Sequence, residues 1–326
     1  MTSRTALHDV IHTQADAIAR LAGADFSGPA ERLVGARRIV LIGTGTSRHA
    51  AALGAMMFAR AGIDARWSSA AGFARWGAPL RDGDAMVVIT HTAETAFALT
   101  CREQALAAGI PVVSITGHGS GWPDAVETVE RERSETYTAS YTSALTVLAS
   151  LAAHLGAEEF APDALRRTAE AVRAVVAEPG IDEVAFPARS IALIGAGPWG
   201  VTAREGALKI REASRTLAEG YEAEDYLHGS AVPFGSADGL ILLEPAGDPD
   251  GLTAALGEAA RQEGITVHTL GGAPAGLSPL LAQLPMTARL QLLADRFAEI
   301  RRQDPDVAIV GAWAEKRLWT LGAPVA

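Results

Sequence analysis

Cysteine is almost absent from this chain of 326 residues, since Cys101 is the only one. A single cysteine excludes an internal disulfide and is typical of a protein that works in a reducing cytoplasm. Basic residues are also few, with 28 Lys and Arg against 38 Asp and Glu and a formal net charge of −10. A nucleic-acid surface needs clustered Lys and Arg, so this balance argues against a nucleic-acid partner. Apolar runs of membrane-spanning length and a secretory leader are missing as well, so we predict a cytoplasmic protein with no membrane partner.

Metal and nucleotide-cofactor patterns are missing too. The eight histidines and one cysteine show no spacing typical of metal ligands. The first glycine turn, Gly43-Thr44-Gly45, has Arg48 where a dinucleotide-binding G-x-G-x-x-G pattern needs its third glycine. We therefore predict no metal and no cofactor.

What the chain does contain is an alternation of short apolar runs and longer periodic segments. The short runs predict strands near residues 39–42, 63–67, 86–89, 111–116, 190–194, 240–243 and 266–270. The periodic segments predict helices near residues 5–33, 48–61, 96–108, 144–155, 162–177, 201–217, 251–263 and 283–302. Such alternation is typical of βαβ units with a parallel sheet covered on both faces.

A repeat divides the chain into two halves. Ile39-Val40-Leu41-Ile42-Gly43-Thr44-Gly45 and Ile191-Ala192-Leu193-Ile194-Gly195-Ala196-Gly197 are the same strand and glycine turn, each followed by a predicted helix. We therefore predict an α/β fold of two doubly wound, flavodoxin-like parallel-sheet domains. The expected divisions are a helical lead (1–34), a first domain (35–156), a helical linker (157–184), and a second domain with a C-terminal tail (185–326).

Hydroxyl side chains gather in three loops of the first half, each expected after a strand. They are Thr44, Thr46 and Ser47, then Thr90, Thr92 and Thr95, then Thr136, Thr138, Ser140 and Thr142. A single such residue most often caps a helix. Three loops at the carboxyl ends of parallel strands, next to helix N-termini, favour a phosphate site.

Ionisable side chains gather at the start of the second half. Glu205, Lys209 and Glu212 are spaced so that they share one face of the predicted helix, and an acidic loop after it, residues 218–229, ends at His228-Gly229. Taken singly, the pair Glu205 and Lys209 is an ordinary surface salt bridge, and His228 is an ordinary loop histidine. Together they suit proton abstraction and ring opening in sugar chemistry, because a carboxylate and an imidazole can both titrate near neutral pH.

These motifs resemble the sugar isomerase (SIS) domain family. The resemblance rests on Gly43-Thr44-Gly45-Thr46-Ser47, on residues 90–95, on the Glu205–Glu212 stretch and on His228. In detail the chain is similar to the double-SIS isomerase half of glucosamine-6-phosphate synthase and to stand-alone aminosugar-phosphate deaminase/isomerases and fructosamine-6-phosphate deglycases. The resemblance implies a phosphorylated sugar or aminosugar as substrate and a homodimer with shared active sites.

The resemblance also implies a role for each matching residue. The phosphate would be held by Gly45, Thr46, Ser47, Thr90, His91, Thr92 and Thr95, and the sugar would be lined by the loop from Glu135 through Thr138. Glu212 would be the base that moves a proton between C1 and C2, and Glu205 and Lys209 would orient groups. His228, which comes from the neighbouring subunit in the family, would open the ring or act as an acid.

The chain departs from the family in three respects. It starts without a glutaminase half, so a separate donor of ammonia would have to serve any aminating reaction. His91 stands where the family has glutamine, and Ala93 where it has glycine. The family synthase uses a lysine near its C-terminus to form a Schiff base with the open-chain ketose. Lys316 takes that place here if a short insertion is allowed, and the alternative is that it is a solvated lysine.

We therefore expect a sugar-phosphate aldose–ketose isomerase or aminosugar-phosphate deaminase, or an ammonia-dependent aminating isomerase, with Glu212 as the proton-transferring base. One alternative is a fructosamine-6-phosphate deglycase. Another, from a different class, is a non-catalytic sugar-phosphate sensor, which would need no base.

Overall fold

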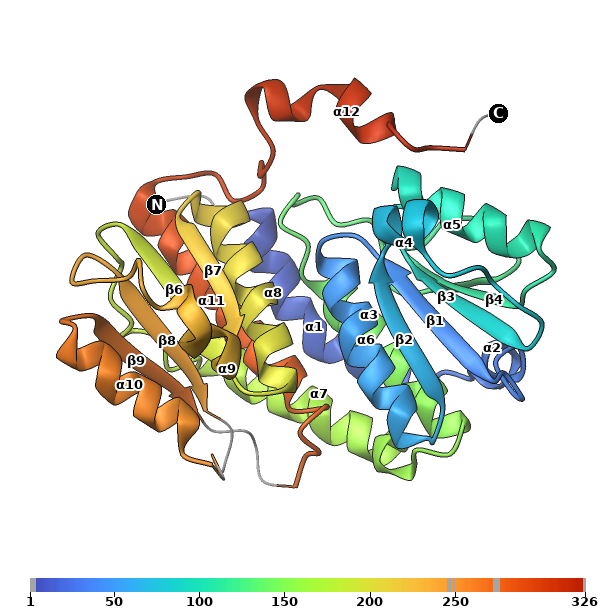
Figure 1. Cartoon of the computed structure of the whole chain (residues 1–326), viewed down its shortest axis with the longest axis horizontal. Coiled ribbons are helices and arrows are strands. Elements are labelled where there is room, and N and C mark those ends of the chain that lie inside the picture. The colour runs from blue at the N-terminus through green and yellow to red at the C-terminus, as the bar shows by residue number, and fades with distance from the viewer. Residues whose placement is uncertain (1–3, 245–247, 249, 272–275, 325–326) are drawn as a thin grey trace. The chain divides into compact units, whose positions relative to one another are not determined.

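Two parallel sheets, one of five strands and one of four, form the framework of the chain (Figure 1). The computed structural model describes residues 4–244, 248, 250–271 and 276–324. The chain divides into two compact units. The first-sheet unit contains residues 14–132, 139–169 and 309–326, and the second-sheet unit contains residues 1–13, 133–138 and 170–308. The predicted α/β class with two parallel sheets is confirmed, whereas the predicted domain boundaries stay a prediction.

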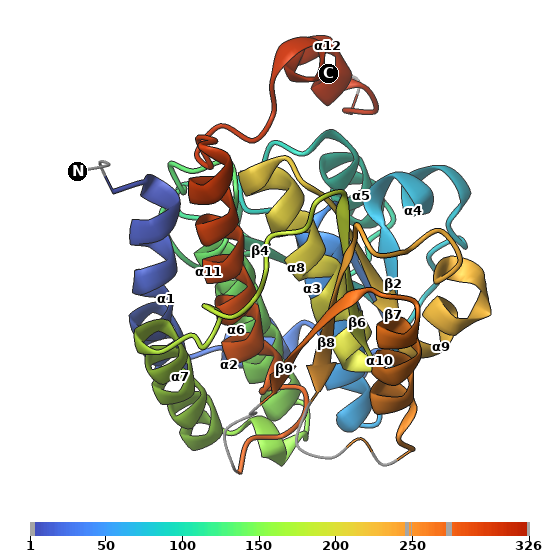
Figure 2. The same cartoon turned by 90° about the vertical axis from the view of Figure 1, so that its left-hand side faces the viewer.

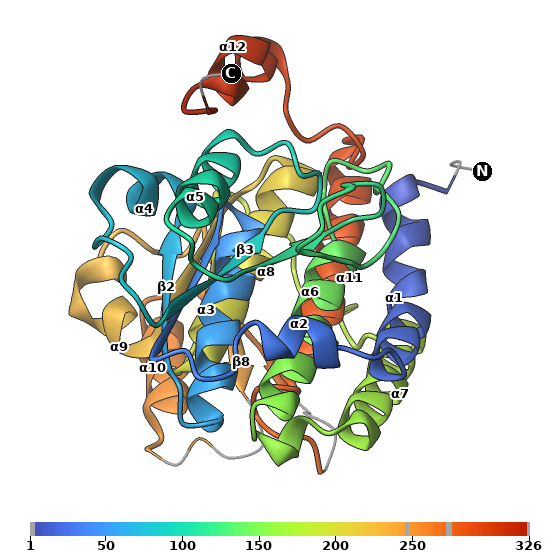
Figure 3. The same ribbon diagram turned by 90° about the vertical axis from the view of Figure 1, so that its right-hand side faces the viewer.

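The first-sheet unit has the strand order β2-β1-β3-β4-β5, with every neighbouring pair parallel. Its strands are β1 (Arg38–Gly43), β2 (Asp64–Ser69), β3 (Asp84–Ile89), β4 (Val112–Thr116) and β5 (Ala125–Glu127). Its main helices are α3 (Thr46–Arg60), α4 (Ala70–Trp76), α5 (Ala96–Ala107) and α6 (Ala139–His154), which cover the sheet in Figure 3. This strand order is one of the two common orders of doubly wound sheets.

The second-sheet unit has the strand order β7-β6-β8-β9, again parallel throughout. Its strands are β6 (Ser190–Gly195), β7 (Leu217–Glu222), β8 (Gly239–Glu244) and β9 (Thr266–Gly271). Figure 2 shows α8 (Pro198–Ser214) and α11 (Gln283–Arg301) on one face and α10 (Leu252–Gln262) on the other. The short α9 (Ala223–Asp225) and a π-helical turn, η2 (Tyr226–Ser230), follow β7.

The remaining helices of the described residues lie before β1, between α6 and β6, or after α11 in the sequence. They are α1 (Ala6–Ala22), α2 (Ser27–Glu31), η1 (Glu158–Phe160), α7 (Pro162–Ala177), η3 (Gly311–Ala314) and α12 (Lys316–Thr320). No helix among the described residues is long and apolar enough to cross a membrane.

Burial on both faces explains why the central strands are continuously apolar. In β6, Ile191 and Leu193 belong to the core beneath α8 and α11, while Ala192 and Ile194 belong to the core beneath α10. Side chains that alternate between two covered faces must all be apolar, which is the pattern expected for parallel strands. The core beneath α8 and α11 also includes Leu7 from the start of α1.

Four predicted elements differ from the structure. The single helix predicted over residues 5–33 is two helices, α1 and α2, and the helix predicted from Ala144 begins earlier, at Ala139. The helix predicted to reach Leu217 ends at Ser214. The acidic loop predicted over residues 218–229 is wrong, because Leu217–Glu222 is the edge strand β7. An edge strand has fewer apolar positions, so its sequence lacks the usual strand signal.

The two repeated glycine turns have the same backbone geometry. Gly45 has φ 57° and ψ −128°, and Gly197 has φ 56° and ψ −123°, a conformation that suits glycine. A Cβ on Gly43 would stand 2.4 Å from the carbonyl carbon of Ser47, and one on Gly195 would stand 2.5 Å from Cβ of Trp199. Each turn thus brings the first turn of a helix directly against the end of its strand.

Candidate functional site

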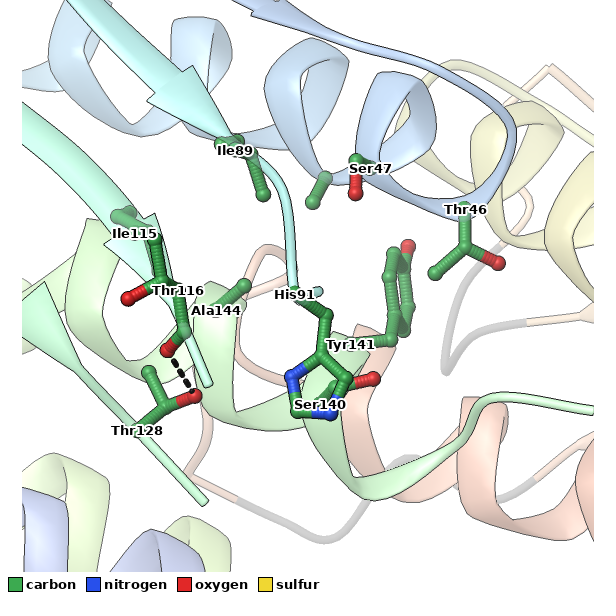
Figure 4. A pocket seen from close by; sticks show the side chains of 11 residues that line it. Thr46, Ser47, Ile89, His91, Ile115, Thr116, Thr128, Ser140, Tyr141 and Ala144 are labelled. Carbon is green, nitrogen blue, oxygen red and sulfur yellow. Dashed lines mark hydrogen bonds between the residues drawn. The ribbon is translucent and has the colours of Figure 1, made fainter. Parts of the chain in front are cut away.

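A polar pocket lies within the first-sheet unit, where β1, β3 and β4 end and α3 and α6 begin. It is partly open to solvent, and its cavity volume is about 20 Å³. Side chains from these separate segments converge on it in Figure 4. Its lining is Thr46, Ser47, Ala50, Ile89, His91, Ile115, Thr116, Thr128, Ser140, Tyr141 and Ala144. No lysine or arginine is among these described lining residues.

One helix N-terminus at this pocket, that of α3, faces no carboxylate in the described contacts, whereas in the first turn of α6 the N–H of Ser140 donates to Glu132 Oε1 at 2.7 Å. The N-cap of α3 is Gly45, which has no side chain to bond the first amide groups of the helix. The N–H of Ser47 donates to the carbonyl of Thr44 at 3.1 Å and that of Arg48 to the carbonyl of Gly45 at 3.0 Å. The helix dipole still favours negative charge at this end, and the hydroxyls of Thr46 and Ser47 stand in the first turn. The pocket therefore suits a phosphate held by neutral donors.

His91 is the titratable group of this pocket. The backbone N–H of Glu132 lies 3.4 Å from its Nε2, and the N–H of Gly117 donates to its carbonyl at 2.8 Å. Burial lowers the pKa of His91 below 6.5, and the carboxylate of Glu132 opposes that shift. The ring is therefore neutral near pH 7, and it offers hydrogen bonds without a fixed charge.

The other predicted phosphate residues near His91 are not among the lining. The hydroxyl of Thr90 donates to that of Thr95 at 3.3 Å, and Thr92 Oγ1 accepts the N–H of Glu94 at 3.2 Å. Between them Ala93 has φ 54°, the left-handed conformation that favours glycine. Sequence reasoning missed Thr116, Thr128 and Tyr141, although Thr116 ends a strand just as Thr90 follows one.

In the second-sheet unit the equivalent glycine turn holds a carboxylate of the chain itself. Glu222 Oε1 accepts the N–H of Gly197 at 3.1 Å, and its Oε2 accepts the N–H of Glu224 at 2.8 Å. Pro198 and the buried Trp199 stand where the first turn has Thr46 and Ser47. The second turn therefore lacks the hydroxyls of the first, and its Gly197 amide is bonded to a carboxylate of the chain.

A buried ion cluster lies on α8. Lys209 Nζ is 2.5 Å from Glu212 Oε2 and 3.6 Å from Glu205 Oε1. The side chains of Lys209 and Glu205 are 1% and 0% exposed, whereas that of Glu212 is 21% exposed. The ordinary interpretation of Glu205 and Lys209 as a surface salt bridge is therefore wrong. Separating a buried pair of this kind would leave a charge buried without a partner, and the free-energy cost of that keeps the two side chains together.

Glu212 is the member of the cluster suited to accept a proton. Burial raises its pKa above 4.5, the nearby carboxylate of Glu205 adds to the rise, and the ammonium of Lys209 opposes it. A carboxylate with a raised pKa is a stronger base than an exposed one, and its partial exposure leaves it accessible.

The remaining predicted site residues are distributed over both units. In the second-sheet unit, His228 is exposed on the π-helical turn, Glu135 is exposed, and Thr138 is 0% exposed. In the first-sheet unit, Lys316 is exposed as the first residue of α12. Their roles stay predictions. No group of His, Cys, Asp and Glu that suits a metal ion occurs within the described part of the chain.

Comparison with known families identifies the unit that carries the pocket. Residues 32–153 match the SIS domain. The segment from β1 to β5 and most of α6 lie inside the match, and so does every residue that lines the pocket.

Curated relatives of the whole chain are glutamine–fructose-6-phosphate aminotransferases (isomerizing). The protein from Methanothermobacter thermautotrophicus is 29% identical over 304 residues, which cover 86% of this chain and 51% of the relative. The protein from Zymomonas mobilis is 28% identical, and the match covers 83% of this chain and 50% of the relative. The chain thus spans about half the length of these relatives.

Solved structures share the fold of this chain. The C-terminal domain of glucosamine-fructose-6-phosphate aminotransferase from Francisella tularensis matches with a TM-score of 0.79 at 19% identity, covering 94% of this chain and 99% of that one. Tagatose-6-phosphate ketose/aldose isomerase from Escherichia coli matches with a TM-score of 0.81 at 16% identity, covering 96% of this chain and 98% of that one. At these identities the likeness concerns the fold alone.

Proposed function

We propose that the chain is a phosphosugar isomerase or aminosugar-phosphate deaminase built from two SIS domains. The observation that carries the proposal is the buried cluster on α8, in which Glu212 is partly exposed and has a raised pKa. A sensor that only binds a sugar phosphate needs no such base. The repeated glycine turn supports a second SIS domain in the second-sheet unit.

The proposal gives separate roles to the two groups of residues. The pocket of the SIS domain holds the substrate phosphate with hydroxyls and the start of α3. Glu212 removes a proton from the carbon next to the carbonyl and returns it to the carbonyl carbon, while the hydroxyl proton of the first carbon moves to the former carbonyl oxygen, which interconverts aldose and ketose. Lys209 stabilises the carboxylate between transfers, and Glu205 holds Lys209 in place.

We further propose a homodimer in which His228 acts in the active site of the neighbouring subunit. Its exposure on the π-helical turn supports this role, because a side chain at the surface can reach a second copy. Mixing the inactive variants Glu212→Gln and His228→Asn tests the proposal. Mixed dimers should regain up to about half of the wild-type activity per dimer, whereas a histidine that acts in its own subunit gives no recovery under this scheme.

The deciding experiment follows aldose–ketose interconversion, together with ammonia and amine release, by NMR with a panel of phosphorylated aldoses, ketoses, aminosugars and fructosamines. Turnover of an aminosugar phosphate that is lost in Glu212→Gln and in Lys316→Ala supports a deaminase with a Schiff-base lysine. Turnover of a fructosamine phosphate that is lost in Glu212→Gln alone identifies a deglycase instead. Binding without turnover anywhere in the panel would contradict an enzyme, and it would identify a sensor.

An amine source is the second variable of the same experiment. Adding ammonia to a ketose phosphate tests the aminating direction, in which a separate protein would supply the ammonia. Formation of an aminosugar phosphate that depends on Glu212 supports this direction, and its absence restricts the proposal to isomerisation and amine release.

A further inference from the structure

The segment from Ser134 to Thr138 does not belong to the same unit as the strand that precedes it in the sequence. It follows β5 and precedes α6, yet it belongs to the second-sheet unit, together with α8. Its burial alternates along the chain: Ser134, Thr136 and Thr138 are at most 1% exposed, whereas Glu135 is exposed. Alternation with a period of two is typical of an extended chain with one face buried.

The buried face of this segment is bonded to a turn that follows α11. Thr136 Oγ1 donates to the carbonyl of Pro305 at 2.8 Å, and Ser134 Oγ donates to the same oxygen at 3.3 Å. The backbone N–H of Glu135 donates to the carbonyl of Asp306 at 3.0 Å. Three successive residues of the segment are thus held by two successive residues of the turn.

The carboxylate of Asp306 holds a third segment at the same point. Its two oxygens accept the N–H groups of Ala6 and Leu7, each at 2.8 Å, so it caps the start of α1 from almost the far end of the chain. The N–H groups at a helix start have no partner within the helix, and they are stabilised by such an acceptor. Leu7 is fully buried in the core that also contains Ile210 of α8.

The turn also meets the end of the helix that carries the ion cluster. Arg215, the C-cap of α8 with φ 53°, donates from its guanidinium to the carbonyl of Val307 at 3.3 Å. Glu212 lies three residues before Arg215, in the last turn of α8. Within the second-sheet unit, the turn therefore connects the 134–138 segment to the end of α8.

We propose that the Asp304–Val307 turn positions the 134–138 segment for the sugar part of the substrate, with Thr136 and Asp306 as positioning residues. The inference rests on the proposed function and on the family resemblance, which implies that the loop from Glu135 through Thr138 lines the sugar. Thr136 and Asp306 do not contact the substrate; they act by holding the backbone of Glu135.

Thr136→Val tests the inference in an active enzyme, because it removes one hydrogen bond and preserves the side-chain shape. Thr168→Val is the matched control: Thr168 is also 0% exposed, and its Oγ1 also donates to a carbonyl at 2.8 Å, that of Ala164. We expect KM for the sugar phosphate to rise about fivefold in Thr136→Val, the effect of one buried hydrogen bond. The inhibition constant of inorganic phosphate should stay unchanged, and Thr168→Val should change neither value.

An unchanged KM in Thr136→Val would overturn the inference, and so would equal changes in KM and in the inhibition constant of phosphate. The second result would indicate a general loosening of the fold rather than a misplaced sugar-facing segment.

Hydrogen exchange tests the turn independently of catalysis. In Asp306→Ala the amides of Ala6 and Leu7 lose their acceptor, and we expect the amide of Glu135 to exchange at least about tenfold faster together with them. Thr136→Val should accelerate exchange of the Glu135 amide as well. Asp306→Asn, which keeps one acceptor oxygen, should accelerate it less than Asp306→Ala does. Unchanged protection of Glu135 in both Asp306→Ala and Thr136→Val contradicts the inference. If the wild-type protein turns over no sugar phosphate, the proposed function is contradicted. The exchange result then still tests whether the Asp304–Val307 turn holds the backbone of Glu135.

Discussion

The ring of His91 lies directly against the backbone of Gly117. A Cβ added to Gly117 would stand 2.7 Å from Cε1 of His91 and 2.9 Å from its carbonyl oxygen. The strand β4 ends one residue before Gly117, so glycine at this position lets the imidazole reach the pocket at the end of β3. The position of the His91 ring therefore depends on the absence of a side chain at Gly117.

Gly117→Ala should destabilise the protein by about 1–3 kcal/mol, because the new methyl group forces the ring or the backbone to move. Thermal or urea unfolding measures the change. The double variant with His91→Ala should recover part of the loss, because the ring contact disappears while the contact with the backbone oxygen remains. Strictly additive losses would show that the two residues are not coupled.

His91→Gln should remove a pH dependence of stability. Burial places the pKa of His91 in the folded protein below its ordinary value of 6.5. The neutral ring is favoured by folding, so its contribution is complete above pH 6.5 and is lost as the pH falls through the lowered pKa. The drop in melting temperature between pH 7.5 and 5.5 should be smaller in His91→Gln than in the wild type. An equal drop in both proteins would show that another group is responsible.

The acid limb of the activity profile should belong to Glu212. A base must be deprotonated, and the raised pKa of Glu212 places the fall of kcat/KM at a pH above the 4.5 of an ordinary glutamate. Glu205→Gln removes a negative neighbour that raises this pKa, so the midpoint should shift to lower pH. A midpoint that stays in place or rises in Glu205→Gln would contradict the assignment.

Ser47→Ala should weaken binding of inorganic phosphate about fivefold, because a hydroxyl that lines the pocket is lost. Thr92→Ala is the informative comparison: the family resemblance gives Thr92 the same role, but Thr92 is not among the lining residues, and its hydroxyl oxygen accepts the N–H of Glu94. Calorimetric titration of both variants should show an effect of Ser47→Ala alone. Equal losses would favour the resemblance over the described pocket.

Glu222→Ala should lower the melting temperature, because the N–H groups of Gly197 and Glu224 lose their common acceptor. We expect a loss of about 1–2 kcal/mol. Glu219→Ala is a control on the same strand that removes the same charge, and the carboxylate of Glu219 is 3.7 Å from Arg211 on the exposed surface. An equal loss in both variants would indicate net charge rather than the capped turn.

Local sequence determined the elements of this protein and the chemical character of its candidate site. The runs at Ile39 and Ile191, each followed by a glycine turn, predicted strands that β1 and β6 confirm, because continuous burial and a positive φ are requirements of the local chain. The spacing of Glu205, Lys209 and Glu212 fixed their common helical face in the same way. The edge strand β7 was not predicted, because its side chains are partly exposed and its sequence shows no run or alternation of apolar residues.

Only the tertiary structure decided which of these groups are desolvated and which segments meet. Lys209 and an exposed helix lysine look alike in the sequence, and packing from α11 and the strands buries one of them. The sequence could not show that residues 133–138 join the unit of α8, that Glu222 fills the second glycine turn, or that His91 lies on Gly117. Periodicity depends on near neighbours in the chain, whereas burial, and with it the pKa of Glu212 and His91, depends on side chains that only folding brings together.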